Sequence, residues 1–297
     1  LSFYKNVNLV YSTWKTGFFD DSFYGNFCES VIKKSISLSG SLSIGTLILR
    51  AFDLMNMSEV YLRRLSFNCP LVANIKIDCK NISHSSNICQ KVASNLKFYL
   101  NLNSNIKTIH ADIGDNTEVS MTILRPSLLM RSSSLTELTL ESGEQEKGLL
   151  VLRIKEIMDI CFAIKILRVI VWFGSALTLP QSFNKLNFPV RESLQELWIH
   201  ERGHDLRTED SADYNSRVKL MKALTDAAPA LEILSFSIPM ELSGILDKFE
   251  SHVRVLHVLI SDGFEWQPSI HQFRRLISNH HCLQQLFLED VSEDTYS

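Results

Sequence analysis

Hydrophobic positions along the chain return in a short pattern of the form L-x-x-L-x-L, in which Ile, Val, Phe or Ala can also take the Leu positions. Polar residues alternate with the last apolar residues of each copy, and this alternation predicts a short strand. The pattern occurs nine times at intervals of 22 to 37 residues, with a mean of about 30, and a period in this range indicates a solenoid. The copies begin at Ile44, Val72, Ile106, Leu135, Ile164, Leu194, Leu231, Val253 and Leu283.

Between copies the apolar residues take the spacing of a helix face. The clearest examples predict helices over residues 218–228, 242–249 and 270–277. Each unit is therefore expected to be a strand followed by a helix. One such unit cannot bury its own apolar face, but a stack of units can. The alternative is a non-repetitive α/β domain with parallel strands.

The repeats from about residue 40 to residue 297 resemble those of leucine-rich-repeat proteins with long, irregular units. The resemblance implies an α/β fold, a curved solenoid of strand-helix repeats of about 30 residues that occupies residues 31–297. Most copies lack the Asn or Cys that commonly follows the last Leu of the pattern.

Residues 1–30 lie outside the repeats and are rich in aromatic side chains. Leu9 and Val10 are followed by Trp14 and then by an Asp-rich turn. Val10 and Trp14 are four residues apart, so a helix would place them on one face. The segment resembles the second half of an F-box, and we expect the first half to be missing from this chain. The alternative is a helical cap that covers the apolar end of the first repeat.

An F-box followed by leucine-rich repeats is the domain order of substrate receptors in SCF-type cullin-RING ubiquitin ligases. The resemblance implies that Leu9, Val10 and Trp14 face a Skp-type adaptor, and that adaptor and cullin bind through the full-length F-box. It also implies that the repeats hold an unknown protein substrate for ubiquitin-dependent degradation. The chain itself would then be no enzyme and would need no cofactor. The alternative is a leucine-rich-repeat scaffold or inhibitor with no ubiquitin link.

The composition of the chain limits the kinds of partner that it is expected to bind and the cell compartment in which it is expected to reside. Thirty Lys and Arg stand against 33 Asp and Glu without a basic block, so nucleic acid is not an expected partner. The most apolar stretch, residues 160–179, contains an uncharged run of only 11 residues, whereas a membrane span needs about 20. The six cysteines form no C-x-x-C pair, which is typical of reduced thiols in a cytoplasmic or nuclear protein.

The stretch His200-Glu201-Arg202-Gly203-His204 matches the zinc signature H-E-x-x-H. That motif requires a helix, which brings the two imidazoles to one metal ion. Here His200 follows a predicted strand directly, and on an extended chain the two histidines would lie about 13 Å apart. A zinc hydrolase is therefore the less favoured alternative, and we expect no catalytic residue and no metal ligand in this chain.

Side chains between the apolar strand positions are expected on the concave face, where a partner would bind. In the second half of the chain these positions carry residue types that are common in interface hot spots. The expected partner-binding residues are Arg168, Trp198, His200, His257 and Phe287. Farther along, His280 and His281 are expected at the end of a helix, where a positive imidazolium would offset the helix partial charge.

Overall fold

The computed structural model describes residues 46–68, 72–79, 85–143, 148–172, 177, 187–201, 211–239, 252–261 and 270–291. The chain divides into two compact units, Leu1–Leu135 and Thr136–Ser297. Residues 1–45 lie outside the described part, and with them the predicted F-box-like segment, its residues Leu9, Val10 and Trp14, and the predicted boundary after residue 30.

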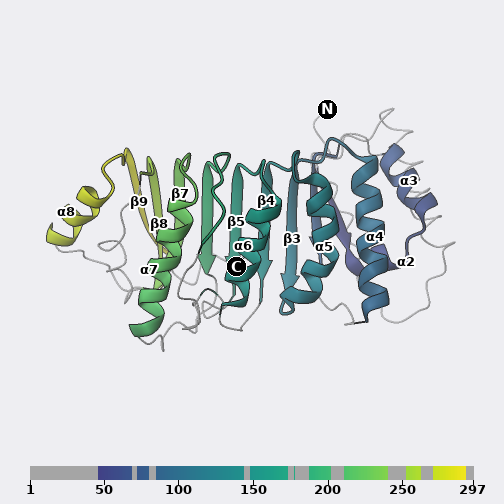
Figure 1. Cartoon of the computed structure of the whole chain (residues 1–297), viewed down its shortest axis with the longest axis horizontal. Helices are drawn as coiled ribbons and strands as arrows, with labels where there is room; N and C mark the ends of the chain where they lie inside the picture. Colours follow the sequence, from purple (N-terminus) through teal and green to yellow (C-terminus); the bar gives the residue numbers. More distant parts are fainter. Residues whose placement is uncertain are drawn as a thin grey trace. The chain divides into compact units, whose positions relative to one another are not determined.

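The first unit contains three described strands that pair in parallel in the order β1-β2-β3. Helices connect the strands, so each repeat is a strand followed by helical structure (Figure 1). The elements are β1 (Thr46–Arg50), α2 (Ala51–Asn56), α3 (Glu59–Asn68), β2 (Asn74–Asp78), α4 (Ser86–Leu102), β3 (Thr108–Gly114) and α5 (Thr117–Arg131).

The second unit contains six described strands that pair in parallel in sequence order. Helices α6 and α7 lie on one side of these strands (Figure 1). The elements are β4 (Glu137–Ser142), α6 (Leu149–Ile160), β5 (Ile166–Val171), β6 (Glu196–Glu201), α7 (Ser211–Asp226), β7 (Ile233–Pro239), β8 (Val255–Ser261), α8 (Ile270–Asn279) and β9 (Gln285–Val291).

All nine strands in the described part of the chain begin two residues after the first apolar position of a predicted copy, so the strand predictions are confirmed. The helices predicted over residues 218–228 and 270–277 are represented by α7 and α8, whereas residues 242–249 lie outside the described part. Alternate strand residues, such as Leu167 and Val169 on β5, are fully buried. This alternation leaves the intervening side chains on the opposite face of the strands.

A recurring set of backbone hydrogen bonds leads into the strands. In several repeats one backbone carbonyl accepts hydrogen bonds from two consecutive N–H groups of the next repeat. The Lys165 carbonyl, for example, accepts from Gln195 (2.8 Å) and Glu196 (2.9 Å), and the Glu232 carbonyl accepts from Arg254 and Val255 (both 2.9 Å). The bonds fix the register between successive repeats and satisfy backbone groups that burial would otherwise leave unpaired.

Cationic side chains from a later part of the chain bind the C-terminal ends of two helices. Arg131 donates to the carbonyls of Leu100 and Asn103 at the end of α4. Arg191 donates to the carbonyls of Met158 and Asp159 in the last turn of α6. The last carbonyls of a helix lack intrahelical donors and carry partial negative charge. A guanidinium at this position donates hydrogen bonds to them and also offsets that charge.

Candidate protein-binding face

The strands of the second unit present one row of side chains that runs across β4 to β9. Strand pairing places its members directly beside one another, because each is the register partner of the next. We call this set the central row; it consists of Thr139, Arg168, Trp198, Ser235, His257 and Phe287. Four of the five predicted partner-binding residues therefore belong to one row. The fifth, His200, lies two residues beyond Trp198 on the same strand.

Side chains of the central row contact one another from strand to strand. The Arg168 guanidinium lies 5.7 Å from the centre of the Trp198 ring, within cation–π distance. The Trp198 ring meets the His257 ring edge to face at 6.1 Å, and His257 meets Phe287 in the same way at 5.8 Å. His200 packs against Trp198 at 5.6 Å. These separations are those of favourable aromatic pairs, so the structure brings all five residues into one connected cluster.

Ser235 makes the contact between Trp198 and His257 possible. These two residues lie on strands β6 and β8, which β7 separates, so their backbones are about 10 Å apart. The residue between them on β7 is Ser235, and its side chain is fully buried. Its short side chain leaves room for the two larger rings to meet above it. Its Oγ also lies 2.8 Å from Nε2 of His200.

Two glutamates hold the polar end of the cluster in place. Glu137 on β4 accepts a hydrogen bond from Arg168, and a Glu196 carboxylate oxygen on β6 lies 4.0 Å from the same guanidinium. Glu196 also accepts a hydrogen bond of 3.3 Å from Nε1 of Trp198. Arg168 and Trp198 are therefore fixed by their own neighbours, which lowers the entropy that a partner would have to remove on binding.

The cluster is open to solvent in part. Phe287 is 46% exposed, and the Arg168 side chain is 32% exposed. Trp198, His200 and His257 have intermediate exposure. Other large apolar side chains, such as Phe67 and Phe162, are more exposed than Phe287, so exposure alone does not mark the site. What distinguishes Phe287 is its contact with His257 and, through that ring, with Trp198. The arrangement can bind a partner by stacking, hydrophobic contact and charge. Its one Ser–His pair, Ser235 with His200, has the Ser side chain fully buried.

The zinc interpretation of residues 200–204 receives no support from the backbone. His200 and Glu201 are the last two residues of strand β6, so they do not form the helical turn that the motif needs. His204 lies outside the described residues. Within the described ranges, no group of three or more His, Cys, Asp or Glu side chains could hold a metal ion.

Sequence reasoning identified the large members of the cluster but missed Ser235, Glu137 and Glu196. Alignment of the repeats with one another is sufficient to predict which residues occupy the central row. Nothing in that alignment, however, indicates that a small residue between two large ones allows ring contact across a strand. The two glutamates lie in the neighbouring row, and their role depends on the side-chain reach of Arg168.

Comparisons with known proteins identify the fold. A leucine-rich-repeat-containing protein from Legionella pneumophila, LegL7, has a similar crystal structure with a TM-score of 0.53. The alignment covers 87% of each chain at 15% sequence identity. No family model and no curated protein matches the sequence. The chain therefore has the α/β fold of a leucine-rich-repeat solenoid, as predicted. In the part of the chain that the structure describes, no helix is both long and apolar enough to cross a membrane.

Proposed function

We propose that this chain is a non-catalytic protein-binding module and that its second unit binds the partner through the central row together with His200. The observation that carries the proposal is the unbroken set of contacts from Arg168 through Trp198 and His257 to Phe287. Trp and Arg dominate interface hot spots, and aromatic side chains are enriched at interface centres. Their fixed positions on strands favour binding because little ordering is required.

The test compares two matched double variants of the whole chain. Trp198→Ala with Phe287→Ala removes the two largest aromatic side chains of the central row. Trp172→Ala with Phe162→Ala removes the same two residue types from positions that are 41% and 55% exposed but lie outside the row. Partners captured by the parent chain should be lost from the first variant and retained by the second, with circular dichroism confirming the fold of both. Equal retention by both variants would refute the proposal.

We further propose that the module serves as the substrate-recognition subunit of an SCF-type ubiquitin ligase. The support is the resemblance of residues 1–30 to the second half of an F-box, followed by the repeats. The assay is co-purification of the upstream-extended gene product with a Skp-type adaptor and cullin. A stable complex that Trp14→Ala disrupts is the expected result. Absence of a complex would leave a leucine-rich-repeat scaffold or inhibitor, with residues 1–30 as its cap.

A further inference from the structure

The face that carries the central row is unevenly charged. It consists of alternate residues of β4 to β9, and we call it the outer face. Among the described residues of β4 to β6 it bears Glu137, Glu141 and Glu196 but only one cation, Arg168. Arg168 is already engaged by two of these carboxylates. The face therefore keeps a net negative charge at this end.

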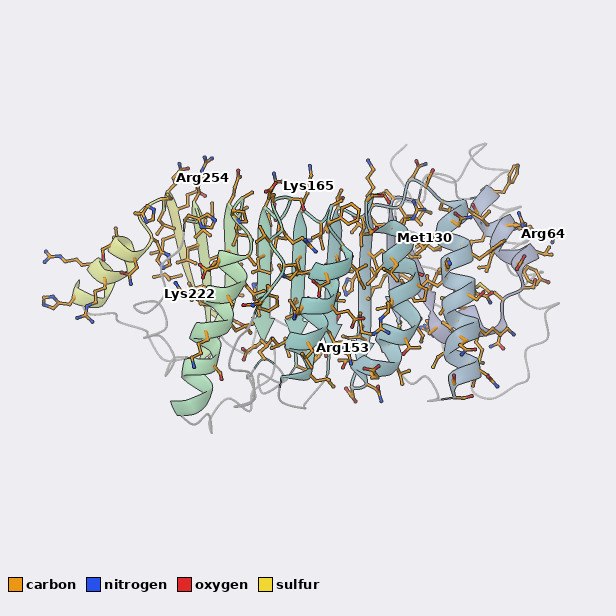
Figure 2. All side chains as sticks on the ribbon, in the orientation of Figure 1. Arg64, Met130, Arg153, Lys165, Lys222 and Arg254 are labelled. Atoms are coloured by element: carbon orange, nitrogen blue, oxygen red, sulfur yellow. The ribbon has the colours of Figure 1, made fainter. Side chains whose placement is uncertain are left out.

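Basic side chains of the same unit lie elsewhere. Arg153 belongs to α6, where it pairs with Glu156 at 3.0 Å, and Lys222 belongs to α7. Lys165 and Arg254 each precede a strand, and both point away from the sheet at the edge where the strands begin (Figure 2). Residues 136–297 carry 24 Asp and Glu against 16 Lys and Arg, so the carboxylates of the outer face belong to a unit that is acidic as a whole. They add local negative charge for a cation that approaches from this side.

The opposite end of the outer face is mixed, with apolar side chains beside polar ones. The outer-face positions of β7 to β9 include the apolar residues Ile233, Val255, Leu259 and Phe287, of which Leu259 is buried and Phe287 is half exposed. Polar residues, among them Ser235, His257 and Glu289, occupy neighbouring outer-face positions. Arg168 on β5 and Phe287 on β9 are separated by four strand spacings, or about 19 Å. An extended segment of about six residues spans this distance. The surface thus fits a segment with charge at one end and an apolar side chain at the other.

We propose that the partner segment is basic: an extended peptide stretch that places Lys or Arg beside Glu137 and Glu196 and an apolar side chain on Phe287. This inference rests on the proposed function of the central row. The cation reaches carboxylates whose positions are already fixed and lies beside the Trp198 indole, whose face also attracts cations. The apolar end gains affinity by covering the half-exposed Phe287 ring.

The probe is a synthetic eight-residue peptide with two Arg at one end and two Leu at the other, labelled for fluorescence anisotropy. A matched peptide carries Glu in place of Arg. At low salt we expect the parent chain to bind the basic peptide about tenfold more tightly than the acidic one, because charge complementarity governs this contrast. Both peptides are tested in both orientations, since charge and apolar ends could be reversed along the segment. Equal affinity for the basic and acidic peptides would overturn the inference.

Two sets of variants assign the effect to the outer face. Glu137→Gln with Glu196→Gln removes two charges from the face, and Glu192→Gln with Glu232→Gln removes two exposed charges from other positions. We expect the first pair to weaken basic-peptide binding about fivefold or more and the second pair to leave it nearly unchanged. An equal loss in both pairs would show general attraction to an acidic protein and would refute the site.

Failure of this inference can be distinguished from failure of the proposed function. If Trp198→Ala with Phe287→Ala abolishes binding of a natural partner but the two glutamate substitutions do not, the central row remains the binding site and the partner is not basic. If the glutamate substitutions weaken basic-peptide binding and the aromatic substitutions change neither peptide nor partner binding, the central row fails as the binding site.

Discussion

The guanidinium of Arg131 is expected to be a major source of stability in the first unit. The residue is the last of α5, yet its Nη atoms reach the end of the preceding helix, α4. Nη2 donates to the carbonyl of Asn103 at 2.6 Å and also to that of Leu100, while Nη1 lies 3.5 Å from the Ser104 carbonyl. Burial lowers the pKa of the Arg131 guanidinium, but Arg keeps its charge in proteins.

The loss in the free energy of unfolding expected for Arg131→Met follows from these contacts. Each hydrogen bond to a charged group contributes about 1.5–3 kcal/mol, and a cation at a helix C-terminus contributes about 0.3–1 kcal/mol more. The contact at 3.5 Å is at the limit of hydrogen bonding, so two bonds carry most of the energy. Met keeps the apolar stem, and water can reach part of the freed helix end. We therefore expect a loss of about 3 kcal/mol in the free energy of unfolding.

Urea unfolding of the whole chain, followed by circular dichroism, measures this loss as a shift of the transition midpoint. Lys97→Met is the matched control, because Lys97 is an exposed cation on α4 whose removal should change stability by less than about 0.5 kcal/mol. Arg131→Lys retains the positive charge but cannot reproduce the contacts of the two guanidinium Nη atoms. Its loss of stability should therefore lie between the losses for Arg131→Met and Lys97→Met. A loss for Arg131→Met as small as that for Lys97→Met would refute the reasoning.

Two further predictions concern buried titratable groups. Burial, with His281 nearby, lowers the pKa of His280 to about 4, so its stabilising neutral state is complete above about pH 7 and is lost as the pH falls towards 4. In urea unfolding at about pH 7.5 and pH 5, His280→Gln should remove about 2 kcal/mol of the pH dependence, whereas exposed His281→Gln should not; an unchanged slope in the first variant would contradict this. Burial also raises the pKa values of Cys79 and Cys161 to about 12, so iodoacetamide should label exposed Cys282 in the native chain and the other two only after denaturation. Peptide mass spectrometry measures the labelling, and equal native rates at the three thiols would be the contrary result.

Strand positions could be predicted from the sequence because each repeat uses the same local rule. The apolar residue at the start of a copy is buried, and the strand begins two residues later, as at Leu194 and Glu196. The pattern depends only on neighbouring residues and a fixed period. The same rule places Arg168, Trp198, His257 and Phe287 at equivalent positions of strands β5, β6, β8 and β9.

Contacts between distant residues could not be predicted in this way. Arg131 and Leu100 are 31 positions apart, and only the packing of α4 against α5 brings them together. The expectation for His280 was wrong for a related reason. It directly follows α8, as expected, but it is 1% exposed, and a pKa of about 4 makes it neutral at pH 7. It therefore cannot supply the positive charge that its position beside the helix end had indicated.

Ser235 keeps the aromatic surface of the outer face continuous. Because its hydroxymethyl group occupies so little volume, Trp198 and His257 form one aromatic surface over β7. A Leu or Phe in its place would stand between the rings and divide that surface into two smaller binding sites. The strands and their backbone pairing would be unchanged, since the substituted side chain makes none of those bonds. A change in one codon could thus redirect the choice of partner while preserving the scaffold that presents it.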